Sequence, residues 1–123
     1  MAEISEDELL KQFEIAKELI DKDPNEAGML LYKIAESSLI ILANKYVPYY
    51  YEKIIKSKNT KIYLLFEIAN ELSKKLNKNF KKYWYEAWEL RIESHEYNLT
   101  SDFLKERIKT IEKIINFIKH KKK

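Results

Sequence analysis

Residues 80–98 read FKKYWYEAWELRIESHEYN and contain both tryptophans of the chain. At about 100° per residue, a helix would gather four glutamates within about 80° and Trp84, Trp88, Arg91 and His95 within about 60° on the opposite side. The glutamates are Glu86, Glu89, Glu93 and Glu96. We expect the acidic sector to face solvent, so Arg91 and His95 should point inward or toward a partner chain. A charge placed there costs free energy unless it is matched.

Four more helices are predicted, because apolar side chains recur at helical spacing and capping residues precede several of them. Ser5 and Glu8 form a capping box, and Asp23 followed by Pro24 is the clearest helix start in the chain. The expected helices cover about residues 6–21, 24–45, 60–76 and 80–98, with a fifth that begins after Thr100-Ser101-Asp102.

The last helix carries an unusually wide apolar face. Leu104, Ile108, Ile111, Ile115 and Ile118 follow heptad spacing, and further apolar side chains lie beside them. A single antiparallel neighbouring helix would cover less apolar surface than this face presents. We therefore expect part of this face, with part of the preceding helix, to pack across a dimer interface.

Residues 46–59, YVPYYYEKIIKSKN, do not commit to one structure. Pro48 should end the preceding helix or start a short turn after it. A connection of this length is often functional or partly helical. The three consecutive tyrosines could stack on bases, although such clusters more often cover the end of a core.

The whole chain fits a single all-α domain covering residues 1–123, with a basic tail at 119–123. One glycine and two prolines give too little turn chemistry for an all-β protein. We predict a mostly antiparallel five-helix bundle. Its core should contain Leu31, Ile34, Leu42, Leu65, Ala69, Trp84, Ala87, Leu90, Ile108, Ile111 and Ile115.

Composition excludes several classes of protein. The absence of cysteine excludes a disulfide scaffold and a thiolate metal site. No apolar run is long enough to span a membrane, and the acidic start is unlike a secretory signal, so a cytoplasmic location is expected. A net charge of +3 is too small to imply nucleic-acid binding. Abundant Lys, Glu and Ile are typical of hyperthermophile proteins, and an AT-rich genome produces the same bias.

Arg91 and His95 are the candidate catalytic residues, because they are four apart and share a helical face. A histidine can act as general acid or base, and an arginine can clamp a phosphate. Together they suit cleavage of an RNA phosphodiester. In the structural alternative, Arg91 pairs with an inward carboxylate along Trp88, and His95 is a hydrogen-bonded residue at the edge of the core.

Other groups of residues give weaker predictions of a metal-binding or ligand-binding site. His95 and Glu96 lack the spacing of a helical zinc site, so neither a metal site nor a cofactor is predicted. Trp84 and Trp88 are candidate ligand-binding residues together with Glu96, although aromatic residues at helical spacing are usually core.

The layout resembles the HEPN superfamily of helical-bundle domains, and within it the archaeal PaREP-type proteins. The resemblance covers about residues 5–118 and is carried by AGMLLYKIAESSLIILA, FEIANELSKKL and KKYWYEAWELRIESHEYNL. In the third segment, Trp84, Ala87 and Leu90 form a PaREP-like Trp-x-x-Ala-x-x-Leu pattern, which Glu96 and Leu99 follow as Glu-x-x-Leu.

The resemblance implies a homodimer and, in catalytic members, a metal-independent ribonuclease with an Arg and a His separated by four to six residues. Here only three residues separate Arg91 from His95, and Ile92 follows the arginine. This departure favours a dimeric binding module for nucleotide, RNA or a partner protein such as a nucleotidyltransferase-type antitoxin. The alternatives are a metal-independent endoribonuclease, toxin-like or RNA-processing, and a purely structural oligomer.

Overall fold

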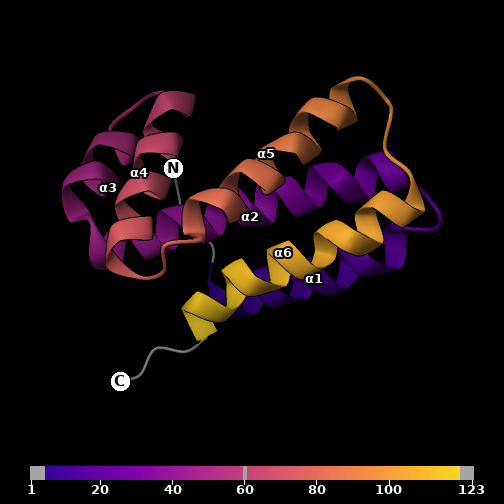
Figure 1. Cartoon of the computed structure of the whole chain (residues 1–123), viewed down its shortest axis with the longest axis horizontal. Helices are drawn as coiled ribbons and strands as arrows, with labels where there is room; N and C mark the ends of the chain where they lie inside the picture. Colours follow the sequence, from indigo (N-terminus) through magenta and orange to yellow (C-terminus); the bar gives the residue numbers. More distant parts are fainter. Residues whose placement is uncertain (1–4, 60, 120–123) are drawn as a thin grey trace.

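A computed structural model describes residues 5–59 and 61–119, and within these ranges the chain forms six helices and no strand. The helices are α1 (Glu6–Leu19), α2 (Pro24–Tyr46), α3 (Pro48–Ile55), α4 (Ile62–Lys75), α5 (Phe80–His95) and α6 (Ser101–Lys119) (Figure 1). The all-α prediction is confirmed. Most boundaries lie within about three residues of those expected. Thr60, where the third helix was expected to begin, and residues 120–123 of the basic tail lie outside the described residues.

The predicted count of five helices is wrong, because residues 48–55 form α3. Pro48 has no amide hydrogen to continue α2, and a proline also disfavours helical geometry in the residue before it. Val47 accordingly leaves the helical region, with φ −138° and ψ 64°. Pro48 then occupies the first turn of the next helix, where its fixed φ is favourable.

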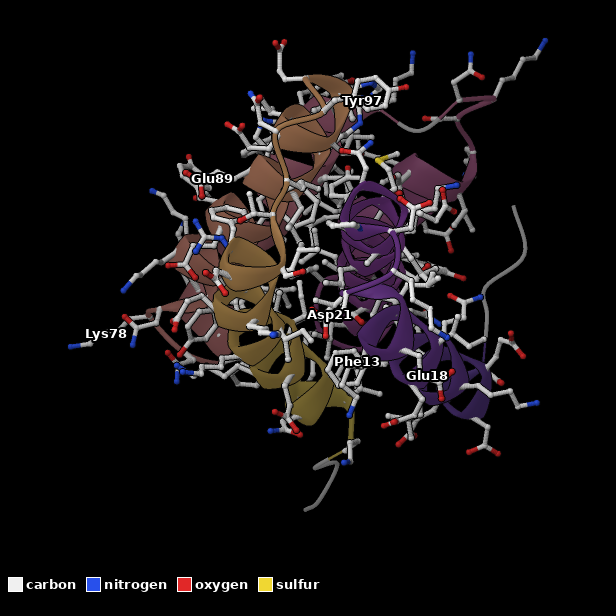
Figure 2. The ribbon with its side chains drawn as sticks, turned by 90° about the vertical axis from the view of Figure 1, so that its right-hand side faces the viewer. Phe13, Glu18, Asp21, Lys78, Glu89 and Tyr97 are labelled. Carbon is white, nitrogen blue, oxygen red and sulfur yellow. The ribbon has the colours of Figure 1, made fainter. Side chains whose placement is uncertain are left out.

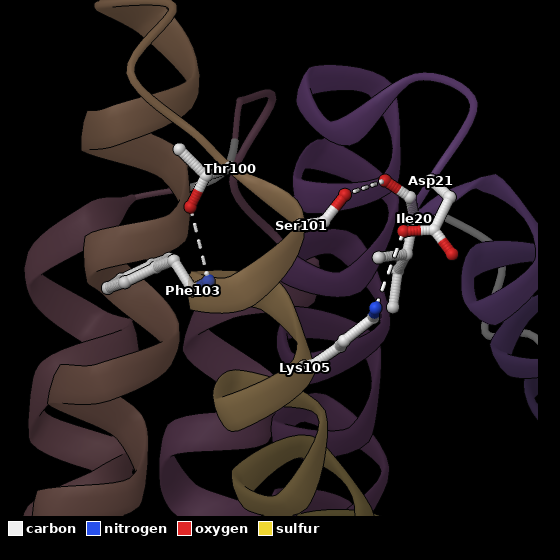
Figure 3. Close-up of polar contacts among 6 residues, drawn as sticks. All are labelled: Ile20, Asp21, Thr100, Ser101, Phe103 and Lys105. Carbon is white, nitrogen blue, oxygen red and sulfur yellow. Dashed lines mark hydrogen bonds and ion pairs between the residues drawn. The ribbon is translucent and has the colours of Figure 1, made fainter.

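The predicted caps explain three helix starts. Ser5 Oγ accepts a hydrogen bond from the Glu8 amide at 3.1 Å, and Asp23 Oδ1 accepts one from the Glu26 amide at 3.2 Å. At the start of α6, the Thr100 hydroxyl accepts from the Phe103 amide at 3.2 Å (Figure 3). Each side chain satisfies an amide that the first helical turn leaves unpaired.

α2 is the central helix, and all five of the other helices pack against it or against its immediate neighbours. The end of α1 meets the start of α6, where Ser101 Oγ donates to the Ile20 carbonyl and Lys105 pairs with Asp21 (Figure 3). The end of α5 meets the start of α2 through the side chain of Asn25, which donates to the Ser94 carbonyl at 2.9 Å. Because α2 begins soon after the end of α1, the starts of α2 and α6 lie at the same end of the bundle. α2 and α6 therefore run in the same direction, so the arrangement is not simply antiparallel.

Figure 1 shows α1, α2 and α6 along the long axis of the molecule, α5 inclined over them, and α3 with α4 grouped around the C-terminal half of α2. α4 packs against α2, α3 and α5. α4 therefore lies beside the exposed side of α5, where the candidate site is located.

Ten of the eleven predicted core residues are buried, and the exception, Ile108, is partly exposed. The wide apolar face of α6 is mostly covered within the chain. Leu104, Ile111, Ile114, Ile115 and Ile118 are all buried. The apolar surplus expected on α6 is therefore largely accounted for by its contacts with α1, α2 and α5.

Gly28 is buried on α2 and makes room for the segment that joins α5 to α6. A β-carbon added at Gly28 would lie 2.1 Å from Leu99 Cδ1. The missing side chain therefore lets Leu99 pack directly on the helix backbone, which explains a glycine early in a helix that would otherwise disfavour it.

Among the described residues, no helix is both long enough and apolar enough to cross a membrane.

Candidate functional site

α5 lies between α2, α4 and α6, so its side chains face three neighbours. Trp84 is fully buried at the centre of this arrangement, and Trp88 lies one turn further along and is partly exposed. The helix forms because its apolar side chains recur at helical spacing, which places Phe80, Trp84, Ala87 and Leu90 in the core.

Four rings from three helices form an aromatic cluster, which consists of Tyr32, Phe66, Trp84 and Trp88. The Phe66 ring centroid lies 5.7 Å from that of Trp84 and 5.3 Å from that of Trp88. The Tyr32 centroid lies 5.9 Å and 6.0 Å from the same two indoles. These separations are those of favourable edge-to-face and tilted aromatic pairs, so the cluster fixes α5 against both α2 and α4.

Arg91 lies at the edge of this cluster, with its guanidinium 5.2 Å from the centroid of the Trp88 ring. Its electrostatic partner is Glu36 on α2. Burial raises the pKa of the Glu36 carboxyl, while the positive charges of Arg91 and Lys33 act against that rise. Burial, and to a lesser extent the negative charge of Glu36, raises the pKa of the Tyr32 hydroxyl well above its ordinary value. Arg91 thus offsets part of the cost of placing a carboxylate on the central helix.

Two hydrogen-bond donors in the aromatic cluster lack partners. The Tyr32 hydroxyl and the Trp84 indole N–H are both buried and have no hydrogen-bond acceptor within the described part of the chain. An unpaired buried polar group costs about 1–3 kcal/mol, so the cluster keeps these groups at the expense of stability.

His95 is the last residue of α5 and is exposed, and Glu96, which follows it, is exposed as well. Arg91, one turn earlier, is partly buried. The two candidate catalytic residues therefore lie on the same helical face but differ in burial. His95 does not point into the core, contrary to one of the two orientations expected from the sequence.

The acidic sector of α5 is not simply a solvent face, because α6 supplies partners for two of its glutamates. Arg107 forms an ion pair and a hydrogen bond with Glu89, and the Thr110 hydroxyl donates to Glu86. The Arg107 guanidinium also lies 4.5 Å from the centroid of the Phe103 ring. The glutamates on this side therefore help to hold α6 against α5.

No group of three or more His, Asp or Glu side chains that could hold a metal ion occurs in residues 5–59 and 61–119. The residues that sequence reasoning missed are Tyr32, Glu36 and Phe66. A signal for the first two was present, since they are four apart on a helix that is otherwise largely apolar. Phe66 gave no signal that separated it from any other core aromatic residue.

The fold and the α5 site define a small all-α protein in which one arginine lies at the edge of an aromatic cluster, near a partly buried carboxylate. The chain belongs to the archaeal PaREP1/PaREP8 family, whose family model matches residues 5–115. The wider relationship to the HEPN superfamily stays a prediction.

Among solved structures, the chain is similar to a crystal structure of a protein from Sulfolobus solfataricus. The two share 23% sequence identity with a TM-score of 0.78, and the match covers 89% of this chain and 91% of the other. At this identity the likeness shows the fold alone. The search of curated proteins found no match.

Proposed function

We propose that the protein is a binding module that acts as a homodimer, with the contact between the two copies made by an apolar surface of α4 and α5. The observation that carries this proposal is a set of exposed aromatic and aliphatic side chains on these two helices. Tyr63 is 61% exposed, Tyr85 is 50% exposed and Ile92 is 44% exposed. We refer to Tyr63, Phe66, Tyr85, Trp88 and Ile92 as the α4–α5 patch.

The α4–α5 patch is held together by ring contacts between the helices. The Phe66 ring centroid lies 5.3 Å from those of both Tyr85 and Trp88. Tyr63 precedes Phe66 by one turn on α4, and Ile92 follows Trp88 by one turn on α5. An apolar surface of this kind on a small protein is typical of an interaction site.

A second copy of the chain is the partner that this surface fits. Arg91 lies next to Trp88 on α5, and the exposed Glu67 follows Phe66 on α4, so opposite charges flank the patch. A two-fold axis brings the same patch of two subunits together, and each arginine can then approach an acidic side chain of the partner. α6 contributes less to this interface than the sequence suggested, because most of its apolar face is buried within the chain.

Sedimentation equilibrium tests the proposal directly. At micromolar concentration the wild-type protein should have twice the mass of the 14.9 kDa chain. Ile92→Asp should shift it toward the monomer, because the new carboxylate would be buried without a partner in the interface. The matched control is Ile15→Asp on α1, where the isoleucine is 47% exposed and lies outside the patch.

A wild-type monomer would contradict the proposal. Equal behaviour of Ile92→Asp and Ile15→Asp would also contradict it, because the dimer would then use another surface. Circular dichroism of both variants establishes that neither substitution unfolds the chain.

A metal-independent ribonuclease is the second candidate function, and the one observation in its favour is that Arg91 and His95 lie on the same face of α5, one turn apart. Trp88 holds the Arg91 guanidinium in position, and the His95 imidazole is exposed one turn further along the same face. A dimer formed through α4 and α5 with its two-fold axis close to the C-terminal end of α5 would bring the ends of the two α5 helices near one another. The two copies could then complete one cleft with both pairs of side chains.

A further inference from the structure

Five lysines lie within nine residues where α4 turns into α5, and all five are exposed. We call this segment the basic turn, and its lysines are Lys74, Lys75, Lys78, Lys81 and Lys82. Within the described residues, Lys74 pairs with Glu71 at 3.4 Å, and the other four have no ion pair. Lys78 extends from the ribbon into solvent, at the opposite end of α5 from Tyr97 (Figure 2).

Helix electrostatics explain only part of this cluster. Lys74 and Lys75 lie in the last turn of α4, where positive charge is favourable. Lys81 and Lys82 follow the first residue of α5, where the helix dipole disfavours positive charge. The first turn of α5 has no acidic residue, and Asn79 makes no side-chain cap there. Apart from Lys74, the lysines of the basic turn form no ion pair with an acidic side chain of the described residues.

Two surface cavities meet at the basic turn. The first has a volume of about 620 Å³ and extends from Lys78 and Lys81 to Tyr50 on α3. The second, of about 500 Å³, shares the same two lysines and extends to Tyr85. Both cavities thus contain lysines and one aromatic ring, which is partly buried for Tyr50 and 50% exposed for Tyr85.

The acidic side chains in the two cavities are mostly engaged. Glu71 pairs with Lys74, while Glu89 pairs with Arg107 and Glu86 accepts from Thr110. Glu67 is the remaining carboxylate in the lining of either cavity. Lys53 on α3 adds a further positive charge beside Tyr50, with its ammonium 5.9 Å from the centroid of the Tyr50 ring.

The lining of both cavities points to a phosphate-bearing chain rather than to an acidic protein. Neither cavity is lined by an aliphatic side chain, so neither offers the apolar anchor on which protein partners depend. Spaced lysines attract successive phosphates, and exposed aromatic rings stack on unpaired bases. Accessible bases require a single strand, because a duplex keeps its bases stacked inside.

We propose that the basic turn binds the backbone of a single-stranded nucleic acid, with phosphates on Lys78 and Lys81 and bases on Tyr50 and Tyr85. This site is separate from the candidate catalytic residues, because ten residues of helix, about 15 Å, separate Lys81 from Arg91. Tyr85 belongs to the α4–α5 patch and would be covered in the proposed dimer, whereas Lys78, Lys81 and Tyr50 lie outside the patch. Binding through these three residues therefore does not depend on whether the dimer forms. Binding depends on the local positive charge of the basic turn, so a net charge of only +3 for the whole chain is compatible with it.

Fluorescence anisotropy with a labelled oligouridylate of about 10 nucleotides tests the proposal. The double variant Lys78→Glu/Lys81→Glu should weaken binding at least about tenfold at 50 mM salt and should lower the slope of log affinity against log salt by about 1 to 2. The control, Lys11→Glu/Lys22→Glu, makes the same change in net charge at exposed lysines of α1 and the loop after it. It should bind within about twofold of the wild type.

Tyr50→Ala should weaken binding by about fivefold or more if a base stacks on the ring. Polyglutamate of similar length serves as a competitor. Displacement of the oligouridylate by polyglutamate at equal charge would identify an acidic-protein surface and overturn the proposal. Equal loss in the two lysine variants, or no loss in either, would also overturn it. Sedimentation of the same samples keeps the outcome separate from that of the dimer proposal.

Discussion

Glu36 is a carboxylate on the central helix, and Arg91 is the main positive charge that acts on it. Burial raises the carboxyl pKa in the folded chain above its ordinary value of 4.5, so the folded state binds the proton more tightly than the unfolded state does. The contribution of Glu36 to stability is therefore largest below pH 4.5 and is lost as pH rises through the folded pKa. Arg91 reduces that loss by favouring the ionised form.

Arg91→Ala should therefore destabilise the protein in a pH-dependent way. At pH 7 we expect a loss of about 1 kcal/mol, the size of a partly exposed charge interaction. At pH 4 the loss should be much smaller, because a protonated Glu36 needs no partner. Urea unfolding at both pH values measures the difference.

The control for this effect is Arg91→Ala in a Glu36→Gln background, where its cost should be the same at both pH values. If Arg91→Ala costs equally at pH 4 and pH 7 with Glu36 present, the arginine stabilises the fold only by packing on Trp88.

At the scale of the element, α5 ends in a motif that a non-glycine residue fits poorly. The Asn98 amide donates to the Glu93 carbonyl at 3.0 Å, and the Tyr97 amide donates to the Ser94 carbonyl at 3.1 Å. This is the Schellman pattern, which requires a left-handed residue after the helix cap. Tyr97 occupies that position with φ 57°, and its side chain is 82% exposed.

Tyr97→Gly should stabilise the protein by about 0.5–1 kcal/mol, because glycine adopts the left-handed conformation without the β-carbon clash. The midpoint of urea unfolding measures this gain. Tyr97→Ala is the control, since alanine keeps the β-carbon and should give no such gain. Equal stabilisation by both substitutions would show that removal of the exposed ring, rather than relief of the backbone, is responsible.

At the scale of the whole molecule, the placement of α5 determines whether Arg91 and His95 can act together. We expect the wild-type protein to leave labelled single-stranded RNA intact in EDTA, because His95 faces solvent while Arg91 is engaged with Trp88 and Glu36. Gel analysis of the RNA tests this expectation.

Cleavage would support the ribonuclease function only if it depended on both side chains. His95→Ala should then lower the rate about 10²–10⁴-fold, which is the usual contribution of general acid–base catalysis. Arg91→Lys should also abolish cleavage, because an ammonium cannot reproduce the two parallel hydrogen bonds of a guanidinium. Cleavage that survives either substitution would come from a contaminating nuclease.

The sequence by itself determined the helical class, the starts of three helices and nearly all of the core. Caps such as Asp23 with the Glu26 amide join residues three apart, and apolar periodicity is a property of one helix at a time. The sequence did not distinguish α3 from a turn, because Pro48 is compatible with either a turn or a new helix start.

Only the tertiary structure decided which elements meet and how each helix is rotated about its axis. The interaction of Glu36 with Arg91, the hydrogen bond from Thr110 to Glu86 and the cavities at the basic turn all join residues of different helices. The sequence pattern marks an apolar face but not the neighbour that covers it, so it placed Glu86 and Glu89 in solvent. Packing of α6 against α5 gave these glutamates partners and left the exposed apolar surface on α4 and α5.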